Sequence, residues 1–295
     1  MDKPVIAGNM LSFTKLRQHL YGEIGWTFKE PGRRPEILSN LEKWRMIKSY
    51  VGGYDFNGTL TGIGFDGQPF QIHDLSVPDI PGEIQSNSYF RGVIVSLRQA
   101  NLFSGRTIIA EDKGVYNPTT VDLMQRIKFE SDDFEHIFEV YSDCYDEASQ
   151  VITSGMVKRL TNFSQLNYCR KVQCVLDGPD VHFILRLGNN FSFSQQLPSG
   201  NFDAAKKGVI AEAGNICILF EQLFRIQACI GQIDSSEASK SRLAFYKKCL
   251  VKMLDAAKNM ESGTGRSATA PDDNNLSYSE HALSSPDDTV RRKAS

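Results

Sequence analysis

Residues 209–224, "VIAEAGNICILFEQLF", contain the clearest periodic signal in the chain. Apolar side chains recur there at spacings of three and four, at Val209, Ala213, Ile216, Cys217, Phe220, Leu223 and Phe224. This spacing places them on one stripe of a long helix, which we predict over 203–230. Because such a stripe must be buried against another layer, we expect a sheet to cover it.

Two other parts of the sequence have the character of strands. Between residues 56 and 111, a segment of alternating apolar and polar residues contains a turn at Asp66-Gly67, which is typical of a hairpin. It precedes a β-branched run over 93–97, which is typical of a buried central strand. Residues 106–111 are predicted to pair with that run as its antiparallel neighbour. A second hairpin, with its own Asp-Gly turn, is predicted over 171–188.

These segments together predict an α+β fold. One antiparallel β-sheet, made of the 56–111 strands and the 171–188 hairpin, is expected to be covered by helices at 154–166 and 203–230. A last helix, over 236–260, has apolar residues on one side and lysines on the other.

The two ends of the chain differ from this centre. Residues 11–47 are predicted to be helical, and the residues from Ser262 onward have many Ser and Asp and no periodicity, so we predict a disordered C-terminal tail. The predicted organisation is an N-terminal helical segment, an α+β domain and a tail, over 1–48, 49–261 and 262–295.

Composition excludes several classes of function. The chain has 295 residues, 41% hydrophobic and 23% charged, with a formal charge of −2, so it lacks the basic excess that nucleic-acid binding normally needs. No apolar run is long enough to span a bilayer, and the first residues do not form a signal peptide, so a cytoplasmic location is predicted. The six cysteines form no CxxC pair and are interpreted as reduced thiols.

The acid-rich stretch 133–160, "DFEHIFEVYSDCYDEASQVITSGMVKRL", is the natural place to look for a site. His136 and Cys144 are eight residues apart, and no second Cys or His lies nearby, which argues against a metal site. No phosphate loop or dinucleotide motif is present, so no cofactor is predicted. No nucleophile, base and electrophile can be assembled, so no catalytic residue is assigned.

Five residues remain as binding candidates. Arg91 and Arg106 open the central strand and its predicted partner, and each would take its own carboxylate, with Asp143 and Glu147 available. Such pairs are either structural salt bridges or part of an anion-reading face. His73, beside Asp74, is a candidate base with its orienting group.

Three functions are left open. The first is a non-enzymatic binding or scaffold domain with a protein partner. The second is a hydrolase or transferase whose site forms from distant residues, with His73, Asp143 and Glu147 as the first candidates. The third is weak binding to an anionic membrane surface through the basic helix at 240–258.

Several motifs also resemble a known family. The segments "YFRGVIVSL" (89–97), "FSGRTIIAED" (103–112) and "FESDDFEHIFEVYSDCYDEASQVITSGMVKRL" (129–160) are similar to a bacterial family of uncharacterised proteins, domain of unknown function 3137. The resemblance covers about residues 45–225 and implies a single α+β domain, with no established activity to carry over.

The resemblance also bears on location. Family members often have hydrophobic membrane segments ahead of the domain and are sometimes encoded beside LemA-type membrane proteins. It therefore implies a bacterial protein, cytoplasmic or peripheral at the inner membrane, with a membrane protein as a possible partner. The present chain departs from that pattern, because its first 45 residues have the character of an amphipathic helix.

Overall fold

The structure is a computed structural model. It describes residues 13–30, 32, 34–47, 54–76, 91–99, 103–129, 132–165, 169–187, 202–230 and 236–261, so the tail predicted to be disordered lies outside the described residues. The chain divides into two compact units, Met1–Ala257 and Lys258–Ser295. The elements described below belong to the first unit, apart from the last turn of the final helix.

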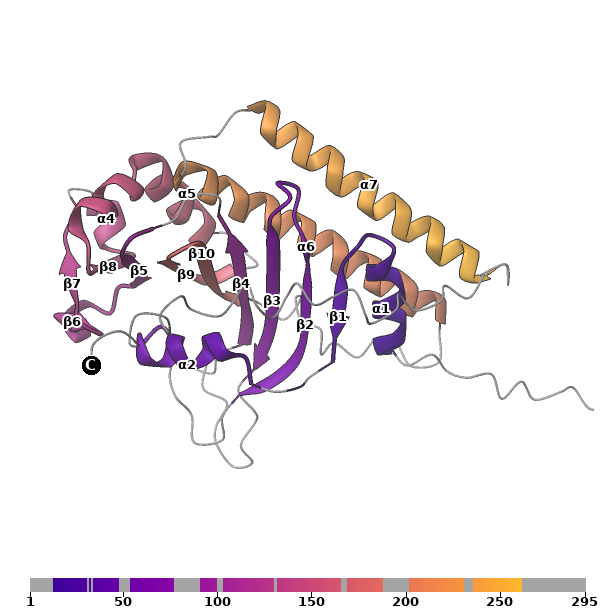
Figure 1. Ribbon diagram of the computed structural model, residues 1–295, viewed down its shortest axis with the longest axis horizontal. Coiled ribbons are helices and arrows are strands. Elements are labelled where there is room, and N and C mark those ends of the chain that lie inside the picture. Colours follow the sequence, from indigo (N-terminus) through magenta and orange to yellow (C-terminus); the bar gives the residue numbers. More distant parts are fainter. Residues whose placement is uncertain are drawn as a thin grey trace, which may run out of the picture. The chain divides into compact units, whose positions relative to one another are not determined.

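The described strands form one antiparallel sheet with the order β1-β2-β3-β4-β10-β9-β5-β8-β7-β6 (Figure 1). The strands are β1 (Thr27–Lys29), β2 (Asp55–Ile63), β3 (Pro69–Ser76), β4 (Arg91–Arg98), β5 (Arg106–Glu111), β6 (Thr120–Val121), β7 (Met124–Ile127), β8 (Phe138–Ser142), β9 (Cys169–Asp177) and β10 (Asp180–Leu187). The helices are α1 (Phe13–Gly22), α2 (Glu36–Lys43), α3 (Asp132–Glu135), α4 (Tyr145–Val151), α5 (Ser154–Ser164), α6 (Phe202–Ile230) and α7 (Ser236–Glu261), with a 3-10 helix, η1 (Gly114–Tyr116).

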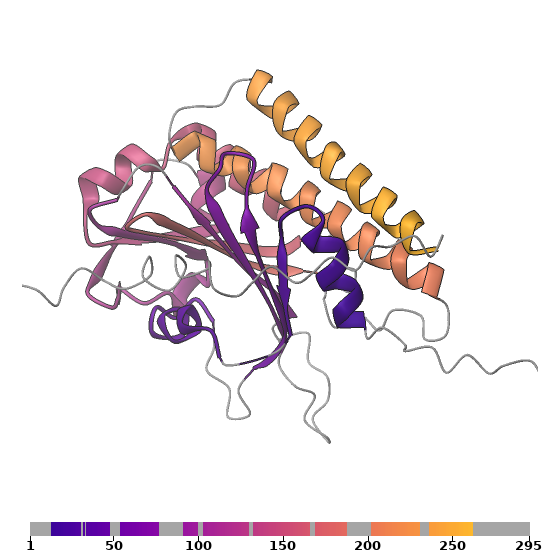
Figure 2. The ribbon, with the colours of Figure 1, turned by 45° about the vertical axis from the view of Figure 1, so that its right-hand side comes forward.

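The predicted α+β architecture is confirmed. Helix α6 lies along one face of the sheet and α2 lies on the other face (Figures 1 and 2). All seven residues of the predicted α6 stripe are buried. An aromatic cluster joins this helix to the sheet, with Phe70 of β3 at 4.6 Å from Phe220 and 5.1 Å from Trp26, measured between ring centroids.

The opposite face has its own core under α2. Leu38 and Leu41 of α2 pack with Ile94, Ile108 and other buried side chains of the central strands. Because α2 is only eight residues long, it covers a limited part of this face.

The two predicted hairpins are confirmed. The turn between β2 and β3 has Gly67 at φ 76°, and the turn between β9 and β10 has Gly178 at φ 58°. Backbone of this left-handed kind favours glycine, which is why the Asp-Gly pairs could be identified from the sequence.

The predicted pairing of residues 106–111 with the central strand is wrong. Strand β4 pairs with β3 and β10, whereas β5 pairs with β9 and β8. The β9–β10 hairpin lies between the two strands. The backbone N–H groups of Gln99 and Phe103 donate to Pro179 O at 2.7 Å and Gly178 O at 2.9 Å, so the connection after β4 is bound to the turn of the inserted hairpin.

One segment within 11–47 also differs from the prediction. Residues Thr27–Lys29 form strand β1, which pairs with β2 through the register Thr27↔Thr61. Gly25, at φ 77°, reverses the chain after α1, and Phe28 then points into the core while its neighbours are exposed. An apolar pattern this short cannot be assigned to helix or strand from spacing alone.

Candidate ligand-binding pocket

The carboxylates predicted to pair with strand arginines instead accept hydrogen bonds from the main chain. Glu147 Oε1 and Oε2 accept from the N–H groups of Ser104 and Gly105, both at 2.7 Å. Asp143 Oδ1 accepts from Arg106 N at 2.6 Å. Both side chains therefore hold the turn before β5 against the start of α4.

Arg106 is anchored by other groups. Its Nη2 lies 3.0 Å from Asp177 Oδ1, and its guanidinium carbon lies 4.5 Å from the ring centroid of Trp44. Asp122 accepts from Trp44 Nε1 at 3.2 Å and lies 3.8 Å from Arg106 Nη1. These contacts connect β5, β9, the end of α2 and the β6–β7 turn, which is a structural role.

Arg91 lies at the start of β4, in the central part of the sheet. Its Nε is buried, and within the described part of the chain this atom has no hydrogen-bond partner. In the strand order, β10 and β9 separate Arg91 from Arg106. The two arginines are therefore not brought together as one anion-reading face.

His73 does not form a base and orienter pair with Asp74. Its Nδ1 lies 3.0 Å from Thr59 Oγ1 across the β2–β3 pair, whereas Asp74, as the next residue in the strand, points to the other face and accepts from Asn57. The strand order separates His73 from Asp143 and Glu147 by β4, β10 and β9. The three residues suggested for an enzyme are thus not gathered in the structure.

A second histidine shares the face of His73. His182 Nδ1 of β10 lies 2.8 Å from Ser96 Oγ of β4. Burial lowers the pKa of each imidazole to about 4, and the neighbouring His182 adds to the effect on His73. Both rings are therefore neutral near pH 7.

The two histidines predict a loss of stability in acid. Because the pKa of each falls from 6.5 to about 4 on folding, protonation favours the unfolded chain, so stability is complete above about pH 6.5 and declines as the pH falls toward 4. The expected loss is about 3 kcal/mol for each histidine. Urea unfolding across this pH range should show a smaller loss for His182→Gln than for the wild type. His136→Gln, at an exposed position, is the matched control, and an equal loss in all three proteins would contradict the prediction.

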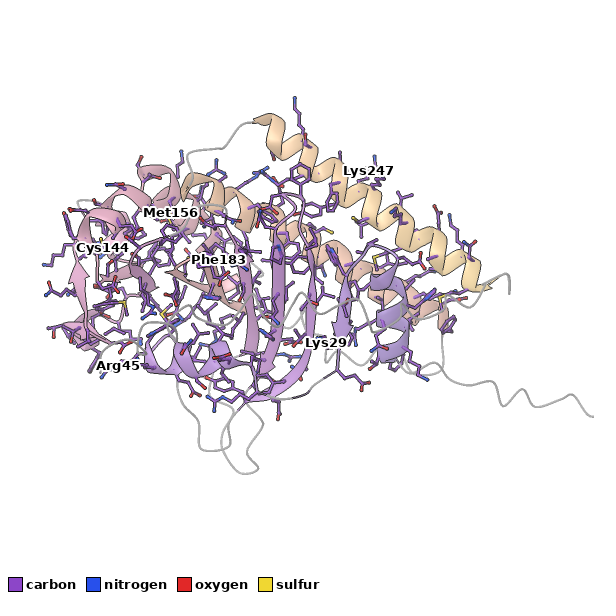
Figure 3. The ribbon with its side chains drawn as sticks, in the orientation of Figure 1. Lys29, Arg45, Cys144, Met156, Phe183 and Lys247 are labelled. Atoms are coloured by element: carbon purple, nitrogen blue, oxygen red, sulfur yellow. The ribbon has the colours of Figure 1, made fainter. Side chains whose placement is uncertain are left out.

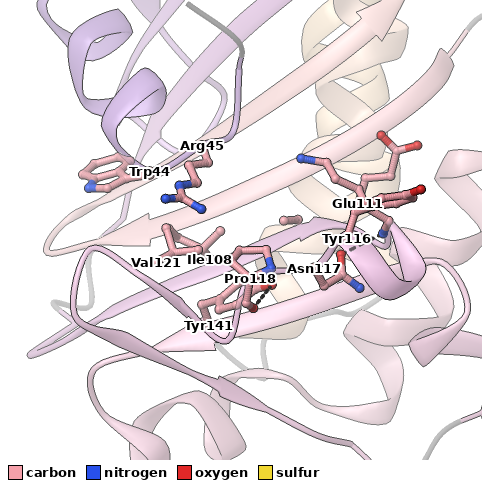
Figure 4. A pocket seen from close by; sticks show the side chains of 11 residues that line it. Trp44, Arg45, Ile108, Glu111, Tyr116, Asn117, Pro118, Val121 and Tyr141 are labelled. Atoms are coloured by element: carbon pink, nitrogen blue, oxygen red, sulfur yellow. Dashed lines mark hydrogen bonds between the residues drawn. The ribbon is translucent and has the colours of Figure 1, made fainter.

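A pocket of about 120 Å³ lies at the end of α2 (Figure 4). Its walls come from the residues after α2, from β5 and β8, and from η1 and the chain leading to β6. Ile108 and Val121 provide apolar lining, and the hydroxyl of Tyr141 donates to Pro118 O at 3.0 Å. The full lining is Trp44, Arg45, Ile108, Ala110, Glu111, Lys113, Tyr116, Asn117, Pro118, Val121 and Tyr141.

Arg45 has an uncommon backbone conformation at this pocket. Its φ is 57°, and the hydrogen bonds Arg45 N→Glu42 O (3.0 Å) and Met46 N→Leu41 O (2.9 Å) close α2 in the manner of a Schellman motif. Glycine usually occupies this position, because a side chain in the left-handed region costs about 1 kcal/mol or more. Figure 4 shows the Arg45 guanidinium directed toward Val121 and Ile108.

The acidic and basic groups around the pocket differ in whether they form ion pairs. Glu111 forms an ion pair with Lys171, and the buried Glu139 beneath η1 binds Arg126 and Asn117. Within the described residues, by contrast, the exposed side chain of Arg45 has neither a hydrogen bond nor an ion pair. The pocket therefore offers the positive charge of Arg45, with which no acid of the described residues forms an ion pair.

Exposed apolar side chains occur in the chain segments that line the pocket. Tyr116, which lines it, is 84% exposed, and Val115 of η1 and Leu123 of the β6–β7 turn are each 93% exposed. The sequence prediction missed Arg45 and Tyr116. The sequence signal for Arg45 is an arginine just after a helix, at a position where glycine is usual. This signal can be recognised only when the end of the helix is known.

Metal binding finds no support in the described part of the chain, where no group of three or more His, Cys, Asp or Glu side chains could hold an ion. The cysteines whose side chains are described are all free thiols, at Cys144, Cys174, Cys217 and Cys249. Over the described residues, none of the helices combines the length and the apolar character needed to cross a bilayer.

Fold and pocket together define an α+β domain with a single antiparallel sheet and a small basic pocket at one end of α2. Residues 88–224 match the family model described as "Protein of unknown function (DUF3137)". The resemblance to this family, predicted over about residues 45–225, is therefore confirmed for residues 88–224.

Two further comparisons complete the findings. None of the curated proteins matches the chain. Among solved structures, the chain is similar to the crystal structure of the mycobacterial trehalose monomycolate transport factor A, TtfA, with 12% identity and a TM-score of 0.35, over 66% of this chain and 90% of that one.

Proposed function

We propose that this domain is a non-enzymatic binding domain whose pocket receives an acidic side chain of a partner protein. The observation that carries the proposal is the Arg45 guanidinium, which lies at the pocket without a counter-ion among the described residues. Guanidinium groups bind carboxylates through two parallel hydrogen bonds, and these charge-assisted bonds are about twice as strong as neutral ones.

The backbone of Arg45 supports a functional role. Strained left-handed residues persist where the surrounding structure enforces them, and they concentrate at ligand sites. Here the two capping hydrogen bonds and the buried neighbours Trp44 and Met46 hold the conformation. A glycine would close α2 without strain, so an arginine at this position costs stability.

The size of the pocket favours the end of a larger partner over a free metabolite. Small-molecule sites usually measure about 300–1,000 Å³, whereas this pocket has about 120 Å³. Tyr116 lines the pocket and is 84% exposed, so it can supply apolar contact area to a partner. Arginine and tyrosine are also the residue types that most often dominate binding energy in protein interfaces.

The test uses Arg45→Gly in the full chain and peptides selected for binding from a displayed random library. We expect the selected peptides to contain Asp or Glu, and Arg45→Gly to weaken their binding at least about tenfold, which corresponds to about 1.4 kcal/mol. Because glycine suits the left-handed backbone, the free energy of unfolding should stay the same or rise by up to about 1 kcal/mol.

The matched control removes a positive charge elsewhere. Lys29→Gln alters an exposed lysine of β1, at the opposite end of the strand order from β8, and should bind the selected peptides as the wild type does. Figure 3 labels both Lys29 and Arg45. Peptides without acidic residues, or unchanged binding by Arg45→Gly, would overturn the proposal. A bacterial origin and a cytoplasmic location, or a peripheral one at the inner membrane face, stay predictions.

A further inference from the structure

Helix α7 has an inner side that is already used by the fold. Arg242, Tyr246, Cys249, Met253 and Ala256 recur at spacings of four, three, four and three, and all are buried. Glu221 of α6 accepts from Arg242 Nε at 2.9 Å and from Ser239 Oγ at 2.6 Å, which fixes α7 along α6. Figures 1 and 2 show α7 beside α6, on the side of that helix away from the sheet.

The outer side of α7 combines apolar and basic residues. Leu243, Val251 and Leu254 are 52%, 47% and 43% exposed, which is unusual for three large apolar side chains on one helix. Together with Lys240 and Lys247 they follow the spacing three, four, four and three, so these five residues share one line on the helix surface. Lys248 and Lys252 are exposed beside this line.

We infer that this outer face of α7, defined by Lys240, Leu243, Lys247, Lys248, Val251, Lys252 and Leu254, docks on a membrane surface that contains anionic lipids. Charge complementarity carries the inference. None of the four lysines has an ion pair with a described residue, and among the described side chains of α7 (239–260) Asp255 is the single acid.

The arrangement suits a bilayer interface better than an acidic protein. Lysine stems can lie along apolar surface while their ammonium groups reach lipid phosphates, and the leucine and valine side chains can enter the region between head groups and acyl chains. Anionic lipid heads attract juxtaposed lysines over about a Debye length, so the binding must weaken with salt. Figure 3 shows Lys247 on α7, in the basic part of this face.

The docking surface lies outside the peptide pocket of the proposed function and does not depend on it. Pocket residues come from the segment just after α2, from β5, η1, β6 and β8 and from the links around η1, whereas the docking residues all belong to α7. Either proposal can therefore fail while the other holds.

Flotation of the full chain with vesicles tests the inference. The probes are vesicles of phosphatidylcholine alone and of phosphatidylcholine mixed with phosphatidylglycerol, at low and at high salt. We expect binding to the mixed vesicles at low salt, loss of that binding at high salt, and a decrease of at least about tenfold in the partition coefficient when Lys240, Lys247, Lys248 and Lys252 are all changed to Glu.

Two further variants separate the contribution of apolar insertion from that of charge. Leu243→Gln with Leu254→Gln keeps every charge and should still reduce partition severalfold, because apolar insertion is lost. Lys29→Glu with Lys158→Glu, at exposed positions in β1 and α5, is the charge control and should bind normally. Circular dichroism and urea unfolding establish that each variant is folded.

Three outcomes would overturn the inference. The first is equal binding to neutral and mixed vesicles, and the second is unchanged partition of the lysine variant. The third is binding to soluble polyglutamate that responds to salt in the same way while the leucine variant partitions like the wild type, which would indicate an acidic protein as the partner.

Discussion

Alanine in place of Gly92 is expected to prevent the domain from reaching its folded state. A Cβ atom at this position would lie 1.8 Å from Leu185 O and 2.9 Å from Leu185 C, both in the backbone of β10. Backbone atoms cannot rotate away as a side chain can, so the β4–β10 pair would have to separate. This pair lies in the middle of the strand order, so its separation would divide the sheet into two parts.

The expected loss of stability in Gly92→Ala is large because Gly92 lies in a central strand. Single substitutions that cost more than about 4 kcal/mol are exceptional, and total stabilities of domains are about 5–15 kcal/mol. Opening a central strand pair should cost at least about 4 kcal/mol, so Gly92→Ala should appear mainly in the insoluble fraction or unfold at much lower denaturant. The measurement is urea unfolding followed by circular dichroism.

Gly214→Ala is the matched control in the same protein. A Cβ at Gly214 meets nothing within 4 Å, and the residue lies inside helix α6. Alanine is favoured over glycine in helices by about 1 kcal/mol, so this variant should be more stable than the wild type. A cost below about 1 kcal/mol for Gly92→Ala would show that β4 and β10 do not approach as closely as described.

Loss of the Glu221 carboxylate is expected to cause the second largest decrease in the free energy of unfolding. Its side chain is 5% exposed and lies 2.9 Å from Arg242 Nε, whose own side chain is 7% exposed. It also lies 2.8 Å from Arg225 Nε on the next turn of α6. Glu221→Leu would leave the buried Arg242 guanidinium without its acid, which costs about 3–5 kcal/mol.

Two measurements distinguish local detachment of α7 from a loss of stability in the whole domain. Urea unfolding gives the change in free energy, and hydrogen exchange of the α7 amides reports whether this helix separates first. The double variant Glu221→Leu with Arg242→Met should recover most of the stability, since apolar pairs often replace buried ion pairs without loss.

A surface ion pair provides the comparison for Glu221. Arg34, with a side chain that is 48% exposed, pairs with Glu42 of α2. Glu42→Gln should cost no more than about 1 kcal/mol. Similar costs for Glu42→Gln and Glu221→Leu would show that the Glu221 cluster is not the attachment of α7 to α6.

Local patterns predicted the elements with a strong period or a specific turn. The α6 stripe, the buried run in β4 and the two Asp-Gly hairpins were all found, because helical spacing, β-branching and left-handed turns depend on residues close together in the chain. Strand β1 was missed, since three residues with one buried aromatic do not distinguish helix from strand.

The candidate residues show the same limit. Asp143 and Glu147 were recognised as a conspicuous acidic pair, but their partners turned out to be main-chain N–H groups of residues 104–106. Main-chain donors are present at almost every residue, so sequence cannot tell which of them a carboxylate will meet. His73 was singled out for its neighbour Asp74, although adjacent strand residues point to opposite faces.

By itself, the sequence determined the α+β class, the long helix α6, the hairpins β2–β3 and β9–β10, and the resemblance to the family of unknown function that residues 88–224 match. Only the tertiary structure decided that the β9–β10 hairpin lies between β4 and β5, and that Arg45 lies over a pocket without an ion pair to any described residue. The reason is physical. Periodicity and turn chemistry are properties of neighbouring residues, whereas strand order and the pairing of charges depend on packing between segments far apart in the chain.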